Sequence, residues 1–190
     1  MIGTHNSMTY LKPKKWYMYP FNFIAKCQSV DIKKQYELGA RIFDIRISYD
    51  KDDNPEFRHG KIAYKGDVHK VLEYLNTIPN IKVRLILEID KSDFGKEILF
   101  ISNYYRFKEK YANISFYEGR RKYDWKQIID LPTLDLIQAV GSMQGSKLNA
   151  VWPWLYAKRN NIKNLKKYYN KPYLLIDFIN ENGATHFPYL

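Results

Sequence analysis

The sequence contains one cysteine, Cys27, among 190 residues. A single thiol excludes an internal disulfide and a cysteine-based zinc cluster, so neither a disulfide-stapled scaffold nor a zinc ribbon is available. The chain also lacks an apolar run of about 18 residues, which excludes a transmembrane helix. No basic stretch followed by a hydrophobic one opens the sequence, so we expect a soluble protein without a signal peptide, cytoplasmic or peripheral to a membrane.

Acidic residues are scarce relative to basic ones, at 20 against 31, which gives a net charge of +11. This excess favours an acidic partner, such as a phospholipid surface, a nucleic acid or a phosphorylated small molecule. Internal repeats and low-complexity linkers are also lacking. A chain of 190 residues with 45% hydrophobic content suits one domain with a full core, so we expect a single domain over residues 1–190 with one active site.

Strands and helices are predicted to alternate along the chain. Apolar alternation between turn residues predicts strands at 41–49, 83–90, 114–117, 134–141 and 173–178. Helices are expected at 29–38 after a Ser29 cap, at 68–76 after an Asp67 cap, and at 92–111, 124–129 and 153–169. This alternation favours a parallel α/β sheet or barrel. Residues 12–26 lack periodicity and are rich in aromatics, so we expect a loop that projects from the body.

Charged side chains occur within three of the predicted strands. Asp44 and Arg46 are two residues apart and therefore share one face of their strand, as do Glu88 and Asp90. Asp177 lies in the last predicted strand. Active sites of parallel barrels form at the C-terminal ends of the strands, so these groups could converge on one pocket. Each alone could instead form a buried ion pair or lie on a solvated edge, but several charges are costly to bury unless they are paired or used.

Two histidines lie in short turns that contain glycine. His5 occurs in GTHNS at residues 3–7, and His59 occurs in RHG at residues 58–60. Two imidazoles suit an acid and base pair near neutral pH, and an arginine can hold a phosphate and stabilise its developing charge. We interpret His69 and His186 as ordinary surface or core residues.

Several motifs follow one another in a fixed order: GTHNSMTY (3–10), QS (28–29), QYELGARIFDIRI (35–47), HG (59–60), LILEID (85–90) and LLIDFI (174–179). This set resembles the catalytic X region of phosphatidylinositol-specific phospholipases C, and is closer to the bacterial type. The resemblance is good over about the first 90 residues and holds only in outline from about 95 to 170. It implies an α/β fold, a distorted or incomplete barrel of the triosephosphate isomerase type.

The resemblance also implies a phosphodiesterase mechanism. His5 would be the general base, which takes a proton from a substrate hydroxyl that attacks its own neighbouring phosphorus. His59 would be the general acid for the leaving alcohol, and a cyclic phosphate would be the first product. Asp177 would orient His5, and Arg46 would contact the phosphate with Asp44 beside it.

Asn6, Glu88 and Asp90 are expected to contribute to substrate binding. As for metal use, the chain resembles calcium-dependent members at some positions and metal-independent members at others. Calcium-dependent members resemble this chain in having an asparagine at the position of Asn6 and acidic residues at the positions of Asp44 and Asp90. The oxygens of these three side chains would suit calcium. Metal-independent bacterial members are similar in having arginine at Arg46, although they usually have aspartate at Asn6 and a lysine near Asp90. We expect no obligatory metal, with calcium as the alternative.

Family members normally have a hydrophobic first strand before the GTH turn, whereas here only Met1 and Ile2 precede it. We therefore expect either that the barrel lacks most of this strand or that the sequence is truncated at its start.

Cations and aromatic residues mix in KKWYMYPFNF (14–23) and WPWLYAKR (152–159). Such mixtures suit the headgroup layer of a membrane, so Trp16, Trp152 and Trp154 are candidates for membrane contact, unless they pack against the barrel. The same composition would suit a nucleic acid, so a phosphodiesterase acting on a soluble or nucleic-acid substrate is one alternative. A catalytically impaired barrel that binds lipid or phosphate is another. A glycerophosphodiester phosphodiesterase would need an acidic metal site, which Arg46 fits poorly. No protein partner is predicted.

Overall fold

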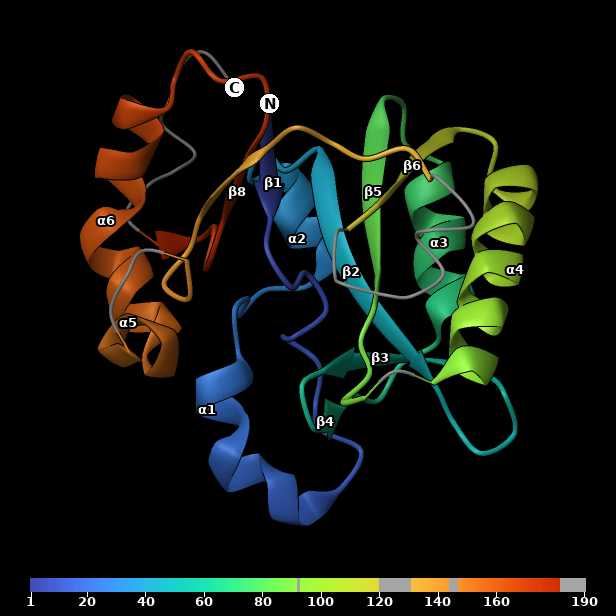
Figure 1. The fold of residues 1–190 in the computed structure, drawn as a ribbon. Coiled ribbons are helices and arrows are strands. Elements are labelled where there is room, and N and C mark those ends of the chain that lie inside the picture. Colours follow the sequence, from blue (N-terminus) through green and yellow to red (C-terminus); the bar gives the residue numbers. More distant parts are fainter. Residues whose placement is uncertain (92, 120–130, 144–146, 182–190) are drawn as a thin grey trace.

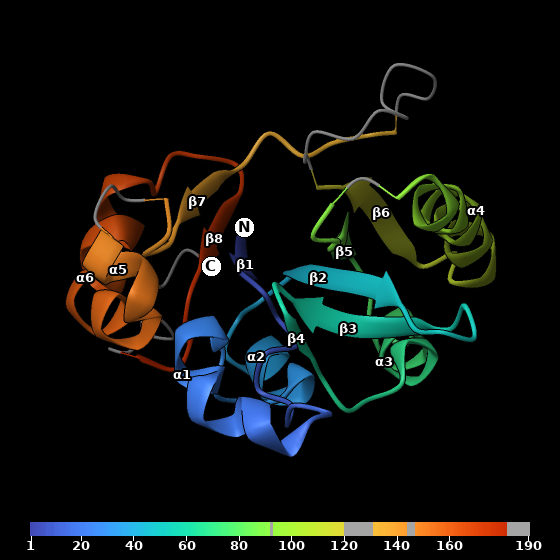
Figure 2. The same cartoon turned by 60° about the horizontal axis from the view of Figure 1, so that its bottom comes forward.

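The centre of the protein is a curved sheet, seen in a computed structural model that describes residues 1–91, 93–119, 131–143 and 147–181 (Figure 1). Its parallel strands are β1 (Ile2–Thr4), β2 (Ile42–Tyr49), β5 (Ile81–Leu87), β6 (Ile114–Glu118), β7 (Ile137–Ala139) and β8 (Leu174–Ile176). They pair in the order β7–β8–β1–β2–β5–β6. Within the described residues β6 and β7 do not pair with each other, so the sheet forms an incomplete barrel that is open between them (Figure 2).

Alternation along the strands separates an apolar face from a polar one. On β2, Phe43, Ile45 and Ile47 belong to the hydrophobic core that also includes side chains of the surrounding helices. Asp44 lies on the opposite face, where the register places it beside Arg84 of β5. The predicted parallel α/β barrel is therefore confirmed in its incomplete form, with polar groups inside it.

A short antiparallel hairpin continues from the end of β2. Its strands are β3 (Pro55–His59), which pairs with the last residues of β2, and β4 (Ile62–Ala63), which pairs with β3. Gly60 lies in the turn between them with a φ of 55°, a conformation that suits glycine. The hairpin brings His59 to the C-terminal end of β1, next to Asn6.

Helices cover the sheet on both flanks of the barrel (Figures 1 and 2). They are α2 (Ile32–Glu37), α3 (Val68–Asn76), α4 (Phe94–Lys110), α5 (Lys147–Val151) and α6 (Pro153–Lys167). The predicted Asp67 cap of α3 is confirmed, because its side chain accepts from the backbone N–H groups of His69 and Lys70. The predicted Ser29 cap is wrong: Asp31 caps α2, and the Ser29 hydroxyl donates instead to Asn180.

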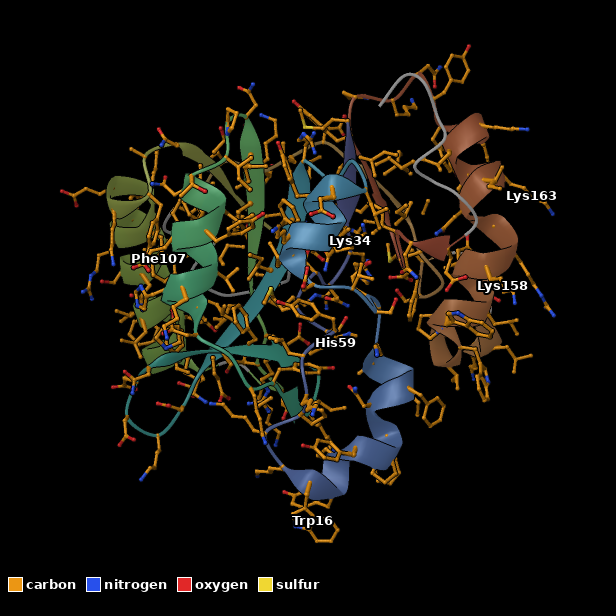
Figure 3. All side chains as sticks on the ribbon, turned by 180° about the vertical axis from the view of Figure 1, so that it is seen from behind. Trp16, Lys34, His59, Phe107, Lys158 and Lys163 are labelled. Atoms are coloured by element: carbon orange, nitrogen blue, oxygen red, sulfur yellow. The ribbon has the colours of Figure 1, made fainter. Side chains whose placement is uncertain are left out.

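The aromatic segment at residues 12–26 projects from the body as predicted, but it is not a loop. It forms a 3₁₀ helix, η1 (Trp16–Phe21), followed by α1 (Asn22–Ala25). Figure 3 shows Trp16 at the tip of this arm and His59 inside the protein. No described helix is long and apolar enough to cross a membrane.

The five predicted strands are present with different ends, and the predicted strand at 83–90 ends earlier, at Leu87. Strands β1, β3 and β4 and helix α5 were not predicted from the sequence. The short β1 pairs with both β2 and β8, so the barrel is continuous where most of a strand was expected to be missing. The predicted helix at 124–129 and His186 lie outside the described residues.

Candidate functional site

A cavity of about 760 Å³ lies at the C-terminal ends of the parallel strands. His5 follows β1, Arg46 belongs to β2, His59 ends β3 and Asp177 follows β8, and all four side chains line the cavity. The outer wall is apolar and comes from η1, α1 and the segment around α5, with Phe21, Ile24, Met143, Ala150 and Pro153. The structure thus brings together four residues predicted to be catalytic, from four separate parts of the chain.

The imidazole of His5 lies between the carboxylate of Asp177 and the guanidinium of Arg46. Its Nδ1 lies 2.8 Å from Oδ1 of Asp177, and its Nε2 lies 2.9 Å from Nη2 of Arg46. A guanidinium can only donate, so Nε2 of His5 is the acceptor and Nδ1–H donates to Asp177. This assignment describes a neutral imidazole whose lone pair is on Nε2, the form that a general base needs.

Arg46 lies at the centre of the polar cluster. Besides its contact with His5, it donates from Nη1 to Oε2 of Glu88 at 3.1 Å, and its Nε lies 3.8 Å from Oδ2 of Asp44. Burial opposes the charge of Arg46, but Asp44 and Glu88 outweigh this effect and raise the pKa of the guanidinium. Arg46 therefore remains a cation in the cavity wall.

Asp44 is fully buried between two guanidinium groups. Its Oδ1 accepts from Nη1 of Arg84 at 3.0 Å, and its Oδ2 accepts from the backbone N–H of Asn6 at 3.2 Å. Burial favours the neutral carboxyl, but the charges of Arg84 and Arg46 outweigh it and lower the pKa of Asp44. Arg84 was not predicted as a site residue, although strand alternation places it on the same face as Glu88.

His59 is neutral in this arrangement. Its Nδ1 lies 2.7 Å from the carbonyl oxygen of Ala25, which fixes Nδ1 as the donor, and its Nε2 lies 3.2 Å from Nδ2 of Asn6. Burial, and after it the charge of Arg46, lowers the pKa of His59 from 6.5 to about 4. The lone pair on Nε2 therefore accepts from the amide of Asn6.

Asn6 joins the two histidine regions through a tight turn after β1. Its backbone has a φ of 46°, a left-handed conformation that asparagine tolerates better than most residues. The side-chain Nδ2 also lies 3.3 Å from Sγ of Cys27, whereas the buried Oδ1 has no hydrogen-bond partner among the described residues. The amide thus points its donor towards both His59 and Cys27.

Two of the predicted binding residues occupy different places. Glu88 is buried against Arg46 and also accepts from the backbone N–H of Gly60 at 3.1 Å. Asp90, in contrast, has a side chain that is 56% exposed, and it pairs with Arg58 at 3.4 Å outside the set of residues that lines the cavity. Glu88 and Asp90 were predicted to share one face of a strand. Strand β5 ends at Leu87, so the alternation of side chains between the two faces does not extend to Asp90.

The arrangement does not fit calcium held by Asn6, Asp44 and Asp90. Both oxygens of Asp44 already accept hydrogen bonds, and two guanidinium groups lie against this carboxylate. Asp90 pairs with Arg58 at the surface. Of these three residues, Asn6 alone offers a buried oxygen without a hydrogen-bond partner among the described residues. Arg46 already supplies a positive charge beside Asp44.

Gln28 links the strands that carry His5 and Asp177. Its Nε2 donates to the carbonyl oxygens of His5 at 3.1 Å and Ile176 at 3.0 Å, and its Oε1 accepts from the backbone N–H of Ile179. Gln28 is fully buried. Gln28 belongs to the QS motif at residues 28–29, but its role of holding the ends of β1 and β8 together is visible only in the structure.

The three tryptophans predicted for membrane contact are exposed. Trp16, Trp152 and Trp154 have exposed fractions of 79%, 49% and 43%. Phe23 of α1 packs against Trp152 at 5.3 Å between ring centroids, so the projecting arm meets the segment before α6. Trp152 and Trp154 flank Pro153, which lines the cavity, and together with Phe23 they form an aromatic rim next to its apolar wall. Trp16 lies at the tip of the arm (Figure 3).

Solved structures support the architecture. The chain is similar to an H258Y mutant of the phosphatidylinositol-specific phospholipase C from Staphylococcus aureus, with a TM-score of 0.62, 16% identity, and 94% of this chain and 84% of that chain covered. It is also similar to the phosphatidylinositol-specific phospholipase C from Listeria monocytogenes, with a TM-score of 0.61, 17% identity, and 97% and 89% covered. No protein-family model matches the chain, and no curated protein matches it significantly. The chain therefore has the fold of bacterial phosphatidylinositol-specific phospholipases C.

Proposed function

We propose that the protein is a phosphodiesterase of the phosphatidylinositol-specific phospholipase C type, which cleaves its substrate by internal hydroxyl attack and forms a cyclic phosphate. One observation carries the proposal: two neutral histidines flank the cation Arg46 in one cavity, and a carboxylate orients one of them. This arrangement supplies a base, an anion-binding group and a second proton-transfer group at a single place.

His5 is the general base of this proposal. Its Nε2 lone pair accepts the proton of the substrate hydroxyl once the phosphate draws Arg46 towards itself. Asp177 keeps Nδ1–H in place and stabilises the imidazolium that forms. Arg46 then neutralises the charge that develops on the phosphoryl oxygens, while Asp44 and Glu88 fix its direction.

His59 is the general acid, and it needs a proton before it can act. In the free protein its pKa is about 4, partly because Arg46 is cationic. A bound phosphodiester anion offsets this cation and raises the pKa of His59. The protonated ring would donate from Nε2, so Asn6 must turn its amide to present Oδ1. The rotation breaks no hydrogen bond to Oδ1, because Oδ1 accepts none from the described residues.

The aromatic rim supports contact with a lipid surface. Solved structures of the Staphylococcus aureus enzyme with the same fold concern its membrane binding. Here Trp152 and Trp154 are exposed beside the cavity and Trp16 is exposed at the tip of the arm, and Lys158 lies 4.9 Å from the ring of Trp154. Indole rings favour the headgroup layer and lysine favours anionic lipid. Phosphatidylinositol in a bilayer is therefore the proposed substrate.

Phosphorus NMR of the products from phosphatidylinositol vesicles tests the proposal, with parallel samples in calcium and in EDTA. A cyclic inositol phosphate in both samples is the expected result, since Arg46 takes the place of a metal. His5→Ala and His59→Ala should each abolish turnover, while His69→Ala, at a histidine outside the cavity that is hydrogen-bonded to Tyr111, should keep it. No cleavage by a folded sample, or full activity in either of the first two variants, would refute the assignment.

The neutral pair of His59 and Asn6 supports one alternative, a barrel that binds a phosphodiester without cleaving it. In that case His59 stays unprotonated with the ligand bound. Vesicle binding that depends on Arg46, together with no cyclic product, would favour this alternative.

A further inference from the structure

Cys27 is a cavity residue that the proposed reaction does not use. Its thiol lines the cavity, is 3% exposed and is the only one in the chain. Burial, and after it the charge of Asp177, raises the pKa of this thiol, so it is not an activated nucleophile. What distinguishes Cys27 is its neighbours rather than its reactivity.

Three different metal-binding side chains converge at this point. His5, Cys27 and Asp177 are all buried, and one ligand atom from each lies within 4.8 Å of the other two. Zinc bonds to sulfur, nitrogen and oxygen are about 2.0–2.3 Å long, so ligand atoms around one ion lie roughly 3–4 Å apart. Small side-chain rotations are therefore enough to form a site. The cavity leaves the fourth, open position to water.

The local charge also favours a dication there. The contacts among Asp44, Arg84, Arg46, Glu88 and the pair of His5 and Asp177 link three carboxylates to two guanidiniums. With neutral histidines this buried set has one net negative charge. A zinc ion that displaces the thiol proton of Cys27 adds one net positive charge and brings the set to neutrality.

We infer that His5, Cys27 and Asp177 form an inhibitory site for zinc or a similar thiophilic divalent cation. The inhibition rests on the proposed function, whereas the metal site does not. A neutral imidazole has one ring lone pair, and zinc would take the one that the general base needs. The remaining ring N–H would also face the donors of Arg46, so zinc removes the contact between Arg46 and His5. Zinc would thus reversibly inhibit the general base, His5.

Metal binding without substrate tests the site. The full chain, freed of metal, is titrated with zinc chloride by calorimetry and with cobalt chloride by absorption, because cobalt bound to a thiolate gives a charge-transfer band. We expect one ion per chain, a cobalt–thiolate band and a higher Tm with zinc. Cys27→Ala should remove the band and weaken zinc binding by more than about tenfold. His69→Ala, which changes a histidine outside the cavity, should bind zinc like the native chain.

Zinc affinity that is unchanged in Cys27→Ala, or a cobalt complex without a thiolate band, would overturn the inference. A second variant, Cys27→Ser, keeps the size of the side chain and guards against a folding defect, and circular dichroism checks both. In the vesicle assay zinc should inhibit the native chain, whereas Cys27→Ala should turn over normally and resist zinc. If neither the native chain nor any variant turns over substrate, the proposed function is wrong. The calorimetric result still shows whether His5, Cys27 and Asp177 bind a metal ion.

Discussion

The side-chain amide of Asn6 donates towards Nε2 of His59 across 3.2 Å. This contact stabilises the neutral imidazole, because a protonated Nε2 would point its hydrogen at the amide donor. Burial and Arg46 act in the same direction, so the pKa of His59 is about 4. A residue proposed to be the general acid is thus held in its basic form until substrate arrives.

Asn6→Asp should raise the pKa of His59 by at least about one unit, because a carboxylate within hydrogen-bond distance stabilises the imidazolium. NMR titration of the histidine rings measures the pKa directly. Asn54→Asp adds the same charge at an exposed site and should leave it unchanged. An unaltered titration of His59 in Asn6→Asp would contradict the assignment of this contact.

Arg46→Ala should lower kcat by roughly 10²–10³-fold, which is the usual loss when a group that stabilises transition-state charge is removed. Arg46→Lys should recover little of it, since a lysine cannot contact Glu88 and His5 at once as the guanidinium fork does. EDTA should not affect the native chain. The measurement is initial rate on vesicles, with Arg58→Lys, at the surface pair with Asp90, as the matched control. Strong inhibition by EDTA would show that Arg46 does not replace a metal.

Much of this site was predictable from local sequence, and the exceptions have physical causes. Strand alternation correctly grouped Asp44 with Arg46, because both lie well inside β2. It failed for Asp90, because the strand ends before that residue. Cys27 and Gln28 come directly after the segment at 12–26 that lacks periodicity. Hydrogen bonds to residues far away in the sequence fix their positions, to Thr9 for Cys27 and to His5 and Ile176 for Gln28. Such contacts between distant segments are not encoded in any local pattern.

Protonation of His59 should destabilise the fold in mild acid. Its pKa is lowered in the folded state, from 6.5 to about 4, so the unfolded chain binds more protons between these values. The contribution of His59 to the free energy of unfolding is therefore fully present above pH 6.5 and falls as the pH drops towards 4, by up to about 3 kcal/mol. Urea unfolding at pH 7 and pH 5 measures this loss. His59→Gln should flatten the dependence whatever its own stability, and His69→Gln should keep it. An equal slope in the native chain and His59→Gln would rule out this cause.

Trp152→Ala should weaken binding to anionic vesicles, because the exposed indole packs with Phe23 at the point where the projecting arm meets the segment before α6. A loss of roughly 1–2 kcal/mol, or about 5- to 30-fold in partitioning, is expected for an aromatic ring leaving the headgroup layer. Tyr169→Ala is the matched control: this ring is 83% exposed and follows the C-terminal end of α6, whereas Trp152 precedes its N-terminal end. Turnover of a soluble, short-chain phosphatidylinositol should be equal in all three proteins, since the change leaves His5, Arg46 and His59 in place. Equal vesicle binding by Trp152→Ala and the native chain would mean that the aromatic rim packs within the protein and does not contact lipid.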